Sequence, residues 1–160
     1  MLNAAFSGFT CAELLGEFDW RAKAFAPDVA FIMIGTNDST RFSPEEFREN
    51  LVELLGRFAS IGTLPVLMTP IPVLRDLNES RRTLPLFAQA MRDVAAERDI
   101  PFIDHFQLWE QCPGMFYLYA DELHPNEHGH LKIALDIFKS LDIYDNEKSW
   151  ICRMFAPEEL

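Results

Sequence analysis

The sequence predicts an α/β domain of three layers, in which helices cover both faces of a mostly parallel sheet. Apolar runs of strand length alternate along the chain with segments of helical periodicity, which is the pattern of this fold class. The run VAFIMI at residues 29–34 has no polar alternation, as in a strand that helices cover on both sides. The chain has 160 residues, 49% of them apolar, which suits one compact domain with a sizeable core.

The first predicted elements flank this apolar run. Residues 2–5 have the composition of the end of a strand, and residues 12–25 predict a helix that ends before Pro27. One face of that helix is apolar, with Leu14, Leu15, Phe18 and Ala22. Because the run at 29–34 is apolar throughout, we expect its strand near the centre of the sheet.

The clearest predicted helix begins after Ser43. Ser43 suits the N-cap, Pro44 the first helical position, and Glu46 completes a Ser-x-x-Glu capping box. Gly62 ends the helix. Its apolar stripe consists of Phe47, Leu51, Leu54, Leu55 and Phe58.

The remaining elements continue the alternation. They are a strand at 65–68, a polar surface loop at 75–83, a helix at 84–98, a strand at 101–103 and a final helix at about 126–141. No repeat or linker interrupts them, so we expect a single domain over residues 1–143. Residues 144–160 form a tail that either docks on the domain or mediates association.

Charge and cysteine content exclude several functions. The formal charge of −11 opposes binding to nucleic acid or to anionic lipid surfaces. Three cysteines without a CxxC pair indicate neither a disulfide framework nor a zinc cage, and we expect no metal or other cofactor. No segment is long and apolar enough to span a membrane, which with Met1 as the true start predicts a cytoplasmic protein.

A polar turn follows the apolar strand directly. Its sequence, Gly35-Thr36-Asn37-Asp38, puts Asn37 at the carboxyl end of the strand, where open α/β sheets form ligand sites. The Asn37 amide there would be a fixed hydrogen-bond donor in a crevice. Gly, Asn and Asp are also common turn formers, so a purely structural turn is the alternative.

A second motif, Asp121-Glu122-Leu123-His124-Pro125, precedes Asn126, which suits the cap of the last helix. A carboxylate three residues before an imidazole is able to accept the Nδ1 proton and leave Nε2 as a general base. A helix-entry loop with only local hydrogen bonds is one alternative. A metal site of Asp121, His124, His128 and His130 is another, although Pro125 and the lack of an HExxH motif argue against it.

A third motif, NAAFSGFT at residues 3–10, passes through Gly8 toward a helix. Glycine lets a backbone N–H approach a bound oxyanion closely, and the helix N-terminus favours negative charge. In this order and spacing, the three motifs resemble those of the SGNH hydrolases, also called GDSL-like lipases and acylhydrolases. The resemblance extends from residue 3 to about residue 141, nearly the whole chain.

The resemblance implies a flavodoxin-like fold and the hydrolysis of a small-molecule ester by serine acyl transfer. Gly8 and Asn37 match the family's oxyanion-binding Gly and Asn, while Asp121 and His124 match its catalytic acid and base. An esterase, lipase or acetylesterase is therefore expected. The alternative is a catalytically inactive module that keeps the crevice and binds a ligand or a partner.

The family's nucleophile motif is absent from these residues. The catalytic Ser of the family lies in a Gly-Asp-Ser motif after the first strand, and no Gly-Asp-Ser occurs in the sequence. We therefore expect that a first strand and helix of roughly 30 residues are missing upstream, which would leave neighbouring strands unpaired and favour marginal stability or homo-oligomers. Ser7, Ser39 and Ser43 are the nearest substitutes, and Ser7 is the best of them.

Overall fold

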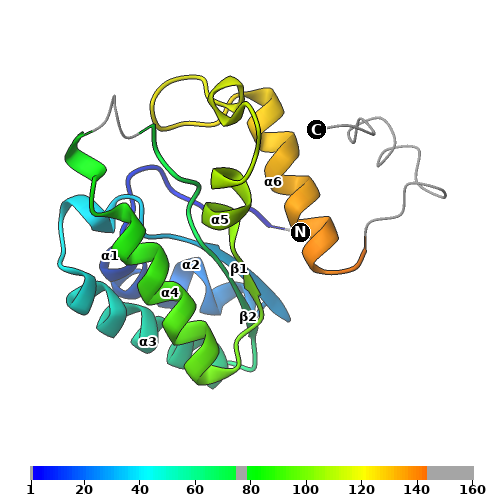
Figure 1. Ribbon diagram of the computed structural model, residues 1–160. Coiled ribbons are helices and arrows are strands. Elements are labelled where there is room, and N and C mark those ends of the chain that lie inside the picture. Colours follow the sequence, from blue (N-terminus) through cyan, green and yellow to red (C-terminus); the bar gives the residue numbers. More distant parts are fainter. Residues whose placement is uncertain (1, 75–78, 144–160) are drawn as a thin grey trace. The chain divides into compact units, whose positions relative to one another are not determined.

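The computed structural model describes residues 2–74 and 79–143 (Figure 1). Its strands are β1 (Val29–Met33), β2 (Leu64–Met68) and β3 (Phe102–Ile103), and its α-helices are α1 (Cys11–Gly16), α2 (Phe18–Arg21), α3 (Pro44–Ser60), α4 (Leu84–Arg98), α5 (His105–Glu110) and α6 (Glu127–Ser140). Four 3-10 helices, η1 (Lys23–Phe25), η2 (Asp38–Thr40), η3 (Glu79–Arg81) and η4 (Met115–Leu118), complete the described elements. The described residues form two compact units, 2–70 with 80–104, and 71–74 and 79 with 105–143.

The first unit contains a parallel sheet and the helices that pack on it. The described strands have the order β1-β2-β3, and both pairings are parallel. Helices α3 and α4 contact each other and β2, and they lie side by side in Figure 1. The α/β class with a parallel sheet, predicted from the sequence, is confirmed.

Helix α3 confirms its predicted cap and stripe. The Ser43 side chain accepts a hydrogen bond from the Glu46 N–H at 3.2 Å, and the Glu46 carboxylate accepts the Ser43 N–H at 2.8 Å. Gly62 adopts a φ of +76° just beyond the helix. All five residues of the predicted stripe are buried, at Phe47, Leu51, Leu54, Leu55 and Phe58. A local capping motif and an apolar periodicity together determined this helix.

The predicted central position of the strand at 29–34 is wrong. Within the described part of the chain, β1 pairs only with β2 and forms an edge of the sheet. Val29, Phe31 and Met33 are 44%, 47% and 38% exposed. The predicted strand at 2–5 does not form either, and there the Asn3 side chain accepts the Ala5 N–H at 3.0 Å. This local turn uses a donor that a neighbouring strand would otherwise need.

The helix predicted at 12–25 is divided into α1, α2 and η1. The break follows Gly16, because glycine is a poor helix former and Glu17 leaves helical geometry with ψ of 9°. Leu15, Phe18 and Ala22 are nevertheless buried, as the predicted apolar face requires, and Leu14 is half-buried.

The second unit holds α5, η4 and α6 around a small core. Ile71, Trp109, Leu118 and Tyr119 form this cluster, and Trp109 is completely buried. Neither α5 nor η4 was predicted. The single domain predicted over residues 1–143 stays a prediction, and the predicted tail at 144–160 lies outside the described residues.

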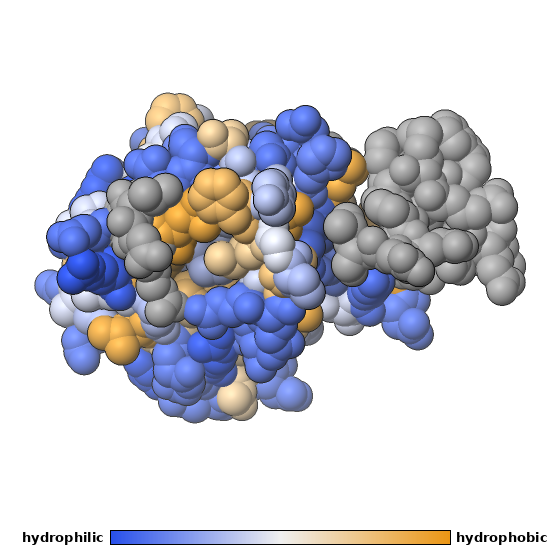
Figure 2. Space-filling model, turned by 45° about the horizontal axis from the view of Figure 1, so that its top comes forward, coloured by the Kyte–Doolittle hydropathy of each residue, from blue (hydrophilic) through white to orange (hydrophobic). Residues whose placement is uncertain are grey.

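Hydrophilic residues predominate on the face drawn in Figure 2, and hydrophobic residues gather there in a few patches. Among the residues that the structure describes, no helix has the length and apolar character needed to cross a bilayer.

Candidate active site

The turn after β1 constrains the backbone of Asn37. Gly35 has a φ of +113°, a backbone conformation that favours glycine, and a Cβ there would be in ordinary contact with the Phe47 ring at 3.4 Å. The Asn37 carbonyl accepts hydrogen bonds from the Thr40 N–H at 3.2 Å and the Thr40 hydroxyl at 2.9 Å. These contacts fix the backbone from which the Asn37 amide projects.

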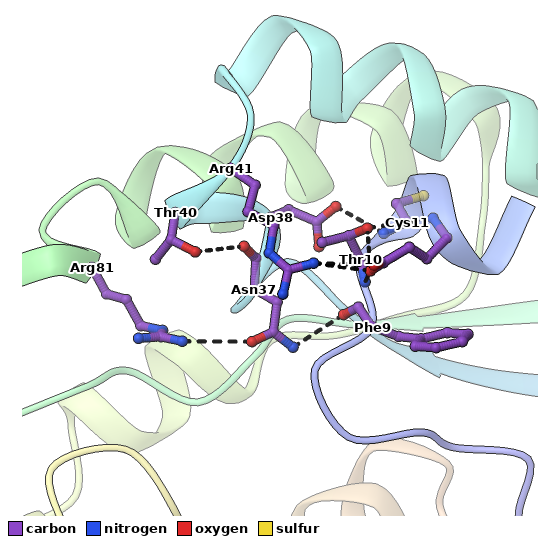
Figure 3. Close-up of polar contacts among 9 residues, drawn as sticks. Phe9, Thr10, Cys11, Asn37, Asp38, Thr40, Arg41 and Arg81 are labelled. Carbon is purple, nitrogen blue, oxygen red and sulfur yellow. Dashed lines mark hydrogen bonds and ion pairs between the residues drawn. The ribbon is translucent and has the colours of Figure 1, made fainter.

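Both ends of the Asn37 amide are engaged (Figure 3). Its nitrogen Nδ2 donates to the Phe9 carbonyl at 3.0 Å, and its oxygen Oδ1 accepts from Arg81 Nη2 at 3.5 Å. These two contacts define which end of the amide carries the donors. An amide nitrogen has two N–H groups, so one is left after the bond to Phe9.

Gly8 lies in the segment that Asn37 contacts. It is exposed and has a φ of +83°, a conformation that glycine adopts without strain. Thr10 then caps α1, since its hydroxyl accepts the Glu13 N–H at 3.3 Å and its own N–H donates to the Glu13 carboxylate at 2.8 Å. The structure thus brings the segment of Gly8 next to Asn37, within the first unit.

Asp121 and His124 form a hydrogen-bonded pair in the second unit. The distance between His124 Nδ1 and Asp121 Oδ2 is 2.8 Å, and Asp121 Oδ1 accepts the backbone N–H groups of Leu123 and His124, each at 2.7 Å. The His124 N–H and ring nitrogen, with the Leu123 N–H, lower the pKa of the Asp121 carboxyl to about 2. The carboxylate is therefore ionised at neutral pH, and the His124 side chain is 69% exposed.

The loop that carries this pair is tied at both ends. The Ala120 N–H donates to the His124 carbonyl at 2.8 Å, and the Asn126 N–H donates to the Leu118 carbonyl at 2.9 Å. The Asn126 side chain caps α6 by accepting the N–H groups of His128 and Gly129, each at 3.0 Å. The predicted capping role of Asn126 is confirmed.

Gly129 also helps to hold the loop that carries Asp121 and His124, because it has no side chain. A Cβ at this position would overlap the Leu118 carbonyl oxygen and would lie 2.7 Å from Pro125 Cβ and 3.1 Å from the Trp109 ring. Only glycine lets the first turn of α6 approach the loop this closely. The predicted motif did not indicate this role.

The candidate replacement serines have different surroundings. The Ser39 hydroxyl donates to the Thr36 carbonyl at 2.8 Å, and Ser39 is buried. Ser43 caps α3, as predicted. Ser7 is exposed next to Gly8.

The alternative metal site has no support in the described residues. No group of three or more His, Cys, Asp or Glu side chains there is arranged to hold a metal ion. His128 and His130 are both exposed on α6.

Two polar residues near Asn37 were missed as candidates, Arg81 and Asp38. Arg81 lies in the polar segment predicted as a surface loop, and its contact with Asn37 joins residues 44 positions apart. Asp38 was part of the turn motif, but its burial was not predicted. No sequence pattern connects either residue with its partner.

A parallel α/β sheet, an Asn amide beyond the end of a strand and an Asp–His pair before the last helix characterise an α/β class of hydrolases. The chain belongs to the GDSL-like Lipase/Acylhydrolase family, whose sequence profile it matches over residues 1–132. Members of this family hydrolyse ester bonds, and the predicted resemblance is confirmed.

The individual relatives have low sequence identity to this chain. The uncharacterized lipoprotein YqeF of Bacillus subtilis is 26% identical over 140 residues, a match to 71% of this chain, which spans 58% of that relative. A lipase/acylhydrolase from Enterococcus faecalis has a TM-score of 0.77 at 24% identity, covering 84% of this chain and 71% of the other. The acetylxylan esterase Axe2 of Geobacillus stearothermophilus has a TM-score of 0.71 at 23% identity, covering 84% and 68%. These structural likenesses show the fold.

Proposed function

We propose that this chain supplies the acid–base pair and the oxyanion donors of an ester hydrolase that works by serine acyl transfer. The observation that carries the proposal is the Asp121–His124 pair, with 2.8 Å between carboxylate and Nδ1. Because Nδ1 donates to Asp121, the other ring nitrogen, Nε2, is the one that accepts a proton. Family membership supports the same chemistry.

In the proposed reaction, His124 Nε2 takes the proton of a serine hydroxyl as the serine oxygen attacks the ester carbonyl. The tetrahedral oxyanion accepts hydrogen bonds from the Gly8 N–H and from the second N–H of Asn37. The alcohol leaves with the proton from His124, and a water molecule then releases the acid by the same steps in reverse order. Asp121 stays ionised and holds the imidazole in the required tautomer.

The proposal assigns the nucleophile to a Gly-Asp-Ser motif outside these 160 residues, since the sequence has none. Its first test is to read the genomic DNA upstream of the Met1 codon for an apolar strand that ends in this motif. The longer reading frame is then expressed and assayed with short acyl esters. Acetylated xylo-oligosaccharides belong in the panel, because one structural relative is an acetylxylan esterase.

Variants of the longer protein assign the roles. We expect His124→Ala to abolish turnover and Asn37→Ala to lower kcat by about 100- to 1000-fold, the usual effect of losing one oxyanion donor. His130→Ala is the matched control, because His130 is an exposed histidine of the same helix region outside the pair. Binding of an ester without turnover would instead identify an inactive binding module, and an effect of His130→Ala equal to that of His124→Ala would refute the assignment.

A further inference from the structure

Asp38 is a carboxylate in an unusual place. The residue is 0% exposed, and this burial raises the pKa of its carboxyl. Hydrogen bonds to the carboxyl, above all that from the Cys11 N–H, lower the pKa but do not outweigh the effect of burial. Its Oδ1 accepts the Cys11 N–H at 2.8 Å, while Oδ2 is buried without a hydrogen-bond partner in the described part of the chain. A half-satisfied buried carboxylate is a poor source of stability, which favours a functional reason for it.

The bond from Asp38 joins two segments that carry the proposed oxyanion donors (Figure 3). Asn37 donates to the Phe9 carbonyl at 3.0 Å, and Asp38 accepts from Cys11 at 2.8 Å. Two consecutive residues of the turn therefore hold two positions of the segment that follows Gly8. A single contact would allow that segment to pivot, whereas two contacts in a row fix its direction.

Capping of α1 does not explain Asp38. Thr10 and Glu13 already form a complete capping box at this helix start. The Cys11 N–H is the first of the helix and lies 27 residues from Asp38 in sequence. Its bond to Asp38 is an additional, long-range tie.

We propose that Asp38 is a positioning residue, which holds the Gly8–Cys11 segment against the Asn37 turn. In this position, the N–H groups of Gly8 and Asn37 both donate hydrogen bonds to one oxyanion. The inference rests on the proposed function for the identity of the two donors. Asp38 itself touches neither the ester nor the reacting atoms.

The first test uses NMR on the 160-residue chain and requires no activity. In the wild type, one Nδ2 proton of Asn37 is bonded to the Phe9 carbonyl, so this proton resonates downfield of a free asparagine amide proton and exchanges slowly. We expect Asp38→Ala to move the resonance of the bonded proton toward that of a free asparagine amide and to speed its exchange by at least about tenfold. Asp38→Asn keeps an acceptor for Cys11 and should leave both features near wild type.

Two further variants keep this test decisive. Asp38→Leu retains the branched shape without an acceptor, and it replaces Asp38→Ala if the latter does not fold. Ser43→Ala is the control for stability, because it removes the α3 cap and touches neither donor. Unchanged Asn37 resonances in Asp38→Ala and Asp38→Leu, or an equal change in Ser43→Ala, would overturn the proposal.

Kinetics of the longer protein provide the second readout. We expect Asp38→Ala to lower kcat by about 10- to 100-fold with KM within about twofold, because a misplaced donor weakens binding of the transition state more than that of the substrate. Asp38→Asn should restore most of the loss. If Asn37→Ala lowers kcat and Asp38→Ala does not, only the role of Asp38 is refuted; if Asn37→Ala has no effect, the proposed function fails.

Discussion

Asp121 binds His124 twice, through the ring nitrogen Nδ1 at 2.8 Å and through the backbone N–H at 2.7 Å. The first contact orients the imidazole and the second closes the turn on which the imidazole stands. One carboxylate therefore sets both the backbone and the side chain of the proposed base. Such a compact arrangement forms locally, within four consecutive residues.

The Asp121 carboxyl should titrate far below an ordinary aspartate. Its pKa of about 2 lies below the ordinary aspartate value of 3.8, so the folded state favours the charged form. The stabilising contribution is then complete above about pH 5 and is lost as the pH falls toward 2. We expect the carboxyl ¹³C resonance of Asp121 to show a midpoint near 2.

Comparison with Asp121→Asn tests the same linkage through stability. The difference in unfolding free energy between wild type and Asp121→Asn should be constant near neutral pH and shrink below about pH 4. A ¹³C midpoint near 3.8, together with a difference that does not depend on pH, would show that the hydrogen bonds to Asp121 are absent in solution.

Two helical glycines should respond oppositely to alanine. Gly129→Ala introduces a methyl group against Leu118, Pro125 and Trp109, and overpacking of this kind costs about 1–3 kcal/mol. Gly56→Ala, on α3, meets nothing within 4 Å and should stabilise by up to about 1 kcal/mol. Chemical denaturation of both variants measures the two changes, and equal signs would contradict the packing at Gly129.

The stability of the protein should depend on the Asp136 carboxylate, which lies in a largely buried cluster with His105 and Lys132. Asp136 contacts Lys132 Nζ at 2.8 Å and His105 Nδ1 at 3.4 Å, and His105 is 0% exposed. Burial raises the pKa of Asp136, but the hydrogen bonds from His105 and Lys132 outweigh it and the pKa is lowered. We expect Asp136→Ala to destabilise the protein by about 3 kcal/mol, because it leaves Lys132 without its carboxylate.

A compensating change separates this charge effect from a loss of packing. Asp136→Leu combined with Lys132→Met removes both charges and keeps most of the volume, so it should recover at least half of the loss. Thermal denaturation of the single and double variants provides the comparison. A double variant no more stable than Asp136→Ala would attribute the loss to packing alone.

The exposed side of β1 should promote self-association of the isolated chain. Phe31 is 47% exposed on a strand that pairs with only one neighbour in the described residues. Open strand edges with apolar flanks tend to pair with other chains. We expect Phe31→Lys to weaken association by about tenfold in sedimentation equilibrium, since a charge on the edge is costly to cover.

Phe116→Lys is the control for this effect, because Phe116 is 62% exposed in η4, outside the sheet. Its association should match that of the wild type. A monomeric wild type, or an equal effect of both substitutions, would exclude β1 as the contact surface.

Much of the fold was predictable from short-range patterns. The cap at Ser43, the apolar stripe of α3 and the cap at Asn126 all appear in the structure as predicted. The Asp121–His124 contact also lies within one turn of chain. Such features depend on hydrogen bonds and periodicities that span a few residues, so the local sequence suffices to indicate them.

The sequence by itself determined the α/β class, most element boundaries and the motifs of the family. Only the tertiary structure decided that β1 is an edge of the described sheet, that Asp38 reaches Cys11 and that Arg81 reaches Asn37. These outcomes depend on which strands find partners and on contacts between residues 27 and 44 positions apart. The same apolar run suits a central or an edge strand, because its pattern records how hydrophobic the strand is and not how many neighbours it has.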